Sequence, residues 1–203
     1  MTADTDGAVF PCRTVLSAGS EFRVVPVEAG VRAVRAWVEY PWPMSPAQAL
    51  ALRDRLGWTS SPTDEEMLTT DHDLEEKDAW FLTAEADRGT RTVSSFNISL
   101  TSRVPKDVMD EAVPITERAF DAYVEALTAV YGRGDRSRSR GVLSVTWTLP
   151  SDTSVEIGTV GWVIDADVDS PANNEAARGE AQYFAEIADE NDVPYIDIDN
   201  PDS

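Results

Sequence analysis

Histidine and cysteine, which supply many catalytic bases, nucleophiles and metal ligands, are almost missing from this sequence. Its 203 residues contain one histidine, His72, and one cysteine, Cys12. A single cysteine excludes a disulfide within the chain, and a lone histidine without a cysteine cluster does not supply the ligands of a zinc site. We therefore predict that the protein is not an enzyme and has no catalytic residues, no metal and no cofactor.

Positive charge is also scarce. The chain has 17 lysine and arginine residues against 37 aspartate and glutamate residues, which gives a formal net charge of -20. A surface of this charge repels the phosphates of nucleic acids and attracts cationic molecules. We expect no nucleic-acid partner and infer a basic protein partner. The lysines are Lys77 and Lys106, and this preference for arginine is typical of a GC-rich bacterium.

Long apolar runs are absent as well. No stretch approaches the roughly 18 residues needed to span a bilayer. Residues 1–7 carry no basic charge and no apolar run follows them, so they do not resemble a signal peptide. These observations predict no membrane partner and a cytoplasmic location. With 42% hydrophobic residues the chain has enough apolar material for a folded core.

The length fits a single domain. Residues 1–20 are small, polar and unpatterned, which predicts a flexible N-terminal segment. Residues 191–203 are acidic and are expected to form a C-terminal tail. The domain itself is therefore expected over residues 21–190, as a monomer or a homodimer.

Several segments have the composition or the alternation of strands. Residues 22–27 are typical of an edge strand, because Pro26 cannot donate to a ladder. Residues 31–40 fit a helix or a strand, and their β-branched and aromatic content favours a strand. Further strands are predicted at residues 66–70, 78–86, 91–101, 142–149 and 154–165. Gly158 and Gly161 are interpreted as bulge points in the last of these strands.

Three helices are predicted from caps and apolar stripes. The first begins at Ser45, with a proline and a capping box in its first turn, and ends at Gly57. The second begins at Pro114 and carries the most regular apolar stripe in the sequence. The third runs over about residues 171–188. It is expected to bury Tyr183, Phe184 and Ile187.

These elements predict an α+β fold, in which an antiparallel sheet has helices packed on one face. The expected order is β-β-α-β-β-β-α-β-β-α. Over about residues 45–188 this order resembles the type III secretion chaperone-like fold. The resemblance concerns element order, and fold by itself does not carry function.

Two polar motifs could in principle bind a metal. His72 lies between two aspartates, but no second histidine supports a metal or a general base, and we interpret it as part of a solvated turn. Asp165–Asp169 has carboxylates at alternate positions, as at the start of a calcium loop. The later positions of that loop do not match. We interpret the motif as a polar strand end, with Asp169 or Ser170 capping the next helix.

One basic motif interrupts the acidic chain. Residues 133–140 contain four arginines among serine and glycine. Such a segment could hold a phosphate or an acidic peptide. We favour an exposed loop that offsets part of the acidic surface.

Acidic residues are concentrated beside the first expected strand of the sheet. Such a cluster steers a cationic partner and speeds association by about 10- to 1000-fold at low salt. A merely solvating surface has the same composition. The predicted partner-binding residues are Asp64, Glu65, Glu66, Asp71, Asp73, Glu75, Glu76 and Asp78.

Three segments resemble members of an uncharacterised actinobacterial family found in immunity-protein-like settings, namely Met44–Trp58, Thr146–Pro150 and Asp169–Asn173. With the charge and the missing catalytic groups, the resemblance implies a non-catalytic acidic binding protein. The expected role is that of an immunity or inhibitor protein that neutralises a cationic toxin. The alternative is a secretion chaperone or adaptor that binds an extended protein segment in a hydrophobic groove. A pocket with two carboxylates of separated pKa would instead indicate an enzyme.

Overall fold

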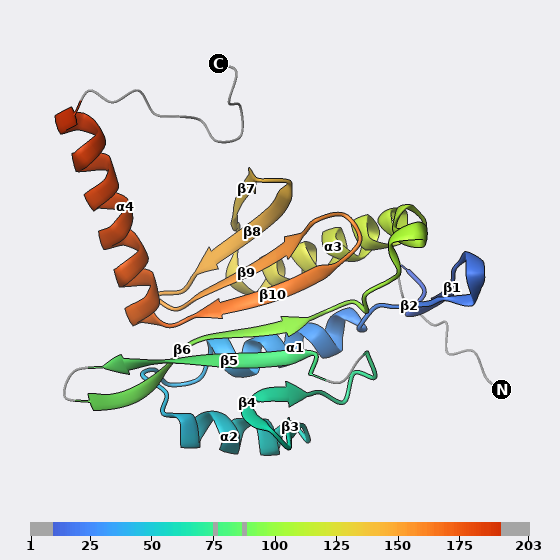
Figure 1. The fold of residues 1–203 in the computed structure, drawn as a ribbon, viewed down its shortest axis with the longest axis horizontal. Helices are drawn as coiled ribbons and strands as arrows, with labels where there is room; N and C mark the ends of the chain where they lie inside the picture. Colours follow the sequence, from blue (N-terminus) through green and yellow to red (C-terminus); the bar gives the residue numbers. More distant parts are fainter. Residues whose placement is uncertain (1–9, 75–76, 87–88, 192–203) are drawn as a thin grey trace.

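The computed structural model describes residues 10–74, 77–86 and 89–191 (Figure 1). In this part of the chain eight strands form an antiparallel main sheet, in the spatial order β3-β4-β5-β6-β10-β9-β8-β7. Its strands are β3 (Thr59–Ser61), β4 (Asp64–Thr69), β5 (Ala79–Ala86), β6 (Thr90–Ser99), β7 (Asp135–Ser139), β8 (Val142–Thr148), β9 (Ser154–Thr159) and β10 (Ile164–Asp169). A separate small sheet pairs β1 (Arg13–Val15) with β2 (Glu21–Arg23). The predicted α+β class is confirmed.

The main sheet joins two halves of the chain along one seam. Strands β3 to β6 come from the first half and β7 to β10 from the second. At the seam β6 pairs with β10, with Ser99 opposite Asp165 and Ser95 opposite Asp169. This pairing is non-local, because it brings together residues that are far apart in the sequence.

The helices lie mainly on one face of the sheet. Helices α1 (Val27–Val38) and α3 (Met109–Tyr131) pack against each other and against β9, on the same face (Figure 1). Helix α2 (Pro46–Arg55) contacts β6, and α4 (Pro171–Asn191) follows β10 and extends away from the sheet. Short 3₁₀ turns occur at η1 (Ser17–Gly19) and η3 (Lys106–Val108). None of the helices in the described ranges is both long and apolar enough to cross a bilayer.

Aromatic rings fill the space between the helices and the sheet. Trp37 of α1 stacks on Phe96 of β6, with ring centroids 3.9 Å apart. Tyr123 of α3 donates its hydroxyl to the carbonyl oxygen of Val25 at 2.8 Å. Position 30 of α1 is a glycine for a steric reason, because a Cβ atom there would lie 2.5 Å from the Tyr123 hydroxyl oxygen.

Residues 31–40, expected to form a strand, instead supply most of α1. Val31, Val34 and Val38 recur with the helical period, and Trp37 completes their buried face. A β-branched residue lowers helix stability by less than about 1 kcal/mol. Burial of each large apolar side chain contributes about 1.5 to 3 kcal/mol. The strand prediction was wrong because packing of the periodic face outweighs local propensity.

The second half of the chain departs from prediction at two hairpins. Residues 133–140 are not a loop, because they contain β7, which pairs with β8. The turn between them is formed by Arg140 (φ 49°) and Gly141 (φ 81°), and a type I′ hairpin requires positive φ at both positions. The expected strand over residues 154–165 is two strands, β9 and β10. Gly161, with φ 102°, lies in the reversal between them and not at a bulge.

Two helix starts were predicted with different success. Ser45 Oγ accepts from the Gln48 amide, and Gln48 Oε1 accepts from the Ser45 amide, so the predicted capping box of α2 is confirmed. Helix α3 begins at Met109, and Pro114 lies inside it rather than at its start. The preceding 3₁₀ turn, which carries no cap signal in the sequence, leads directly into α3.

Helix α4 begins as expected, where Ser170 Oγ accepts from the Asn173 amide at 3.0 Å. The expected burial of Tyr183 and Phe184 is wrong, because these side chains are 60% and 59% exposed. Ile187 is half-buried. Tyr183 and Phe184 therefore do not mark contact with the sheet.

The N-terminal residues that are described contribute to the body. Phe10 and Leu16 are buried in the core, and β1 lies within the segment expected to be flexible. In the segment expected as an edge strand, β2 ends at Arg23 and Pro26 immediately precedes α1. The expected flexible residues 1–9 and tail residues 192–203 lie outside the described residues.

Candidate functional site

The central strands of the main sheet present their polar side chains away from α1 and α3. In β10, Ala166 and Val168 are buried in the core that the helices share. Side chains alternate along a strand. Asp165, Asp167 and Asp169 therefore lie on the opposite, open face.

The register of the neighbouring strands adds a glutamate to these aspartates. Glu156 of β9 lies directly opposite Asp167, and Asn97 of β6 lies opposite Asp167 on its other side. Cross-strand neighbours on one face are about 4.5 to 5.5 Å apart at Cβ, so like charges there repel each other. We call the following set the carboxylate face: Glu156, Asp165, Asp167 and Asp169.

Every member of the carboxylate face accepts a hydrogen bond from a neutral side chain. The donor–acceptor pairs are Asn97 Nδ2 to Asp167 Oδ1 (2.7 Å), Ser99 Oγ to Asp165 Oδ1 (2.8 Å), Asn173 Nδ2 to Asp169 Oδ1 (2.7 Å) and Thr146 Oγ1 to Glu156 Oε2 (2.8 Å). Within the described ranges, none of these carboxylates forms an ion pair. Their orientation is therefore fixed by neutral donors, while Arg103 lies near enough to Asp165 to favour its ionised form.

The pKa values of the three aspartates are raised, because burial disfavours their charged forms. Burial, with further repulsion from Asp165, Asp169 and Glu156, raises the pKa of Asp167 to about 6, against the opposing hydrogen bond from Asn97. Burial also raises the pKa values of Asp165 and Asp169. A cation placed on this face would favour the ionised forms and relieve the repulsion.

Asn97 leaves one polar atom beside the carboxylate face without a partner. The residue is 8% exposed, and its Nδ2 is bonded to Asp167. Its Oδ1 is buried and has no hydrogen-bond partner among the residues described. An unsatisfied buried polar group costs about 1 to 3 kcal/mol.

The carboxylate face does not have the geometry of a calcium loop. Alternate residues of a strand are about 6.5 to 7 Å apart, whereas calcium ligands surround one ion at about 2.3 to 2.6 Å. In the described part of the chain, no three His, Cys, Asp or Glu side chains are close enough to hold one metal. The interpretation of Asp165–Asp169 as a polar strand followed by a Ser170 cap is confirmed.

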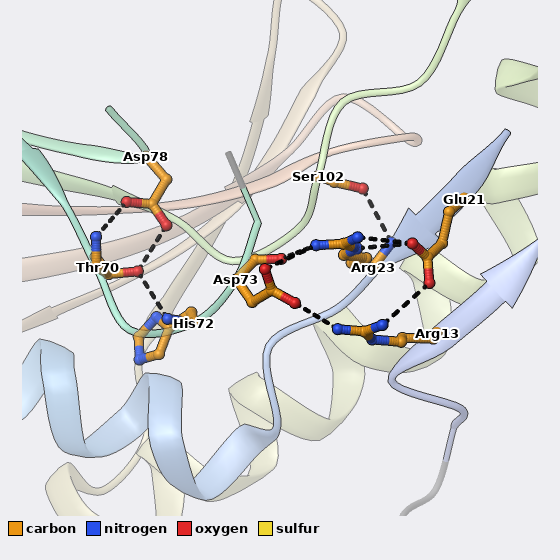
Figure 2. Close-up of polar contacts among 8 residues, drawn as sticks. All are labelled: Arg13, Glu21, Arg23, Thr70, His72, Asp73, Asp78 and Ser102. Atoms are coloured by element: carbon orange, nitrogen blue, oxygen red, sulfur yellow. Dashed lines mark hydrogen bonds and ion pairs between the residues drawn. The ribbon is translucent and has the colours of Figure 1, made fainter. Parts of the chain in front are cut away.

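The acidic cluster predicted from the sequence includes residues with internal roles. Asp78 is 4% exposed and accepts from the Thr70 amide at 2.8 Å and the Thr70 hydroxyl at 2.6 Å (Figure 2). Burial raises the pKa of Asp78. Its carboxylate closes the turn between β4 and β5.

Asp73 links this turn to the small N-terminal sheet. It forms ion pairs with Arg13 of β1 and Arg23 of β2, and Arg23 also pairs with Glu21 at 2.7 Å (Figure 2). Arg23 additionally donates to the Asp73 carbonyl oxygen. The negative charge of Asp73 is therefore balanced within the protein.

Of the other members of the predicted cluster, Asp64, Glu65 and Glu66 lie in β4 and Asp71 follows it. Glu66 pairs with Arg91 at 3.1 Å, and Asp71 accepts from Trp58 Nε1 at 3.0 Å. Asp64 accepts from the Glu66 amide at 3.0 Å. Asp64 and Glu65 are exposed. The two remaining members, Glu75 and Glu76, lie outside the described residues.

His72 does not lie in solvent, as the interpretation of a solvated turn implied. Its side chain is 6% exposed and meets Trp58 edge-on, with ring centroids 5.9 Å apart. Burial lowers its pKa, which favours the neutral imidazole. The burial follows from packing of the His72 ring against Trp58, which is itself part of the core.

Two signals in the sequence could have located the carboxylate face. Asp165–Asp169 alternates acidic with apolar residues, and Asn97–Ser99 alternates polar with apolar residues in the same way. Each pattern marks a strand with one polar face. The pairing of these strands depends on the non-local seam, which neither pattern shows.

The match to a family model covers residues 28–170, well over half of the chain. The model is described as a family of unknown function, DUF6301. The chain belongs to DUF6301. No curated protein matches the chain, and no solved structure matches it.

The region shared with DUF6301 runs from the start of α1 to the end of β10. It therefore contains the whole main sheet and the carboxylate face. The small sheet of β1 and β2 precedes the DUF6301 region, and α4 follows it. Any role of α4 is consequently separate from the part of the chain on which family membership is based.

Proposed function

We propose that this protein is a non-catalytic binding protein that docks its carboxylate face onto a basic protein. The observation that carries the proposal is the position of Glu156, Asp165, Asp167 and Asp169 on adjacent strands, each held by a hydrogen bond from a neutral side chain. Its biological role in this proposal is that of an immunity or inhibitor protein that covers a cationic toxin.

The physical support comes from preorganisation. Strand backbones and side-chain hydrogen bonds hold the carboxylates in place before any partner arrives, so little side-chain entropy is lost on binding. Raised pKa values indicate that the free face is electrostatically unfavourable. An arginine or lysine from a partner would relieve this repulsion, and the net charge of -20 would speed the encounter.

This proposal moves the binding surface away from the cluster expected around β4. Asp73 and Asp78 are engaged within the protein. Asp64 and Glu65 remain exposed and are a suitable comparison, because they carry carboxylates without the same preorganised arrangement.

Binding of an octa-arginine peptide to the full chain tests the location of the surface. The test variant D165N/D167N/D169N removes three charges from the carboxylate face, and D64N/E65Q/D107N removes three exposed charges elsewhere. Calorimetric titration at low salt should show affinity about 3- to 100-fold weaker for the first variant, since each lost ion pair contributes about 0.2 to 1 kcal/mol. The second variant should lose about twofold or less. Equal losses in both variants would contradict the proposal.

A co-expression experiment tests the immunity role. If the neighbouring reading frame in the native genome encodes a basic toxin, co-expression of the wild-type chain should restore growth of cells that produce it. D165N/D167N/D169N should fail to protect at the same expression level, whereas D64N/E65Q/D107N should protect. Protection by both variants would show that the carboxylate face is not the inhibitory surface.

A further inference from the structure

Helix α4 is attached to the body near its N-terminus. Ser154 Oγ donates to Asn174 Oδ1 at 3.1 Å, and Asn174 Nδ2 donates to the Asp152 carbonyl oxygen at 2.7 Å. Arg178 forms an ion pair with Asp152 at 2.5 Å. Beyond this attachment α4 extends away from the sheet (Figure 1). Helices in water depend on packing of an apolar face for most of their stability.

The extending part of α4 carries two exposed aromatic side chains. The rings of Tyr183 and Phe184 meet edge to face, with centroids 5.8 Å apart, and both side chains are more than half exposed. Glu175 and Glu180 lie on the same helix, so the aromatic pair is set in an acidic element. Large exposed apolar groups with a polar surround mark interaction surfaces.

A groove on the body has the complementary character. It lies between α1 and α2 and has a volume of about 730 Å³. Apolar side chains form much of its lining, namely Val31, Ala36, Leu52 and Leu56. A groove of this kind between two helices accepts the apolar side of an amphipathic helix.

The charge of this groove is opposite to that of the protein. Arg32, Arg35 and Arg55 line it, together with Glu28 and Glu39. Arg35 pairs with Glu39 at 2.7 Å. Three arginines against two glutamates leave one net positive charge, in a chain whose net charge is -20. The groove therefore favours an acidic apolar ligand.

We infer that α4 of a second copy of this chain occupies the groove between α1 and α2. Tyr183 and Phe184 enter the apolar lining, and the glutamates of α4 approach Arg32 and Arg55. The molecule's own α4 extends away from α2 (Figure 1), so the contact forms between copies. Reciprocal exchange of α4 produces a closed two-fold dimer, the commonest oligomer symmetry.

Analytical ultracentrifugation of the full chain tests this dimer. Wild type should sediment with the mass of two chains, and both Y183S/F184S and R32E/R55E should sediment with the mass of one. The control for the helix variant is L82S/V130S, which removes two exposed apolar side chains elsewhere. The control for the groove variant is R138E/R140E, which reverses the charge of one exposed arginine in β7 and of another in the turn that follows it. Both controls should remain dimeric. Circular dichroism of every variant should show retained secondary structure.

Mixing the two test variants distinguishes a dimer in which α4 binds the groove from a dimer in which two α4 helices pair with each other. The helix variant retains an intact groove, and the groove variant retains an intact α4, so their mixture should associate more strongly than either variant alone. A wild-type chain that stays monomeric would overturn the inference. A dimer that survives R32E/R55E, or a mixture that associates no better than its components, would also overturn it.

Discussion

Asn97 on β6 donates its side-chain N–H to the carboxylate of Asp167 on β10 at 2.7 Å, across the seam that joins the two halves of the main sheet. The bond satisfies one end of the Asn97 amide, and the carbonyl end stays buried without a partner among the described residues. On its other side Asp167 lies opposite Glu156. Asp167 therefore links the two halves of the main sheet. It is also the member of the carboxylate face whose pKa is raised to about 6 by burial and by the neighbouring carboxylates.

Replacement of Asp167 by asparagine should stabilise the protein at neutral pH. The pKa of Asp167 is raised to about 6 in the folded state, against about 3.9 in an unfolded chain. The folded state therefore binds the proton more tightly, and ionisation reduces stability as the pH rises from about 4 to about 6. The variant D167N should gain about 1 to 2 kcal/mol at pH 7, after allowance for solvent screening.

Urea unfolding at pH 7 and pH 5 measures this effect. The wild-type advantage of pH 5 over pH 7 should shrink in D167N, while D64N at an exposed site should behave as wild type. Lower stability of D167N than of wild type at pH 7 would show that the carboxylate is stabilising and that the assigned direction of its pKa shift is wrong.

Affinity for a cationic probe should fall on acidification. A bound arginine peptide favours the ionised form of Asp167, so protonation near pH 6 opposes binding. Calorimetric titration with octa-arginine should show weaker binding at pH 5 than at pH 7. In D167N the part of the decrease due to this residue should be absent. An unchanged pH profile in D167N would exclude Asp167 from the contact.

Asp78 and Asp73 should differ sharply in their contribution to stability. The change Asp78→Ala leaves the buried Thr70 amide without its acceptor, at a cost of about 1 to 3 kcal/mol. Asp73→Ala removes exposed ion pairs and should cost less than about 1 kcal/mol. Chemical denaturation of both variants provides the comparison. Equal losses would indicate that Asp78 is not the structural member of the predicted cluster.

Two glycine-to-alanine changes should have opposite effects. At Gly30 a Cβ atom would meet the Tyr123 hydroxyl, so G30A should destabilise the fold by about 1 to 3 kcal/mol. At Gly179 in α4 no atom lies within 4 Å of the added carbon, and G179A should raise helix stability by up to about 1 kcal/mol. Thermal unfolding monitors the first change and helical circular dichroism the second. A neutral G30A would contradict the close approach of Tyr123 to α1.

The elements predicted correctly from the sequence are those set by local chemistry. Ser45 and Gln48 identify the start of α2 because a capping box involves neighbouring residues alone. In α1, local β-branched composition pointed to a strand, while the period of Val31, Val34 and Val38 pointed to the helix that forms. In β7 every residue is exposed, so no apolar alternation signals its pairing with β8.

The candidate site was harder to predict because it depends on tertiary contacts. The acidic run near β4 is conspicuous in the sequence. In the structure, however, Asp73 forms ion pairs with arginines of β1 and β2, and Asp78 is buried. Asp165–Asp169 was interpreted correctly as a polar strand. Its placement beside Asn97 and Glu156 follows from strand order in the sheet, which a single sequence does not display.

The central claim is that the carboxylate face, and not the acidic run around β4, meets a cationic partner. Titration of the ¹⁵N-labelled full chain with octa-arginine, followed by amide chemical shifts, tests this claim most directly. We predict the largest shifts in β9, in β10 and at Asn97. Largest shifts at residues 64–73, with β9 and β10 unchanged, would contradict it.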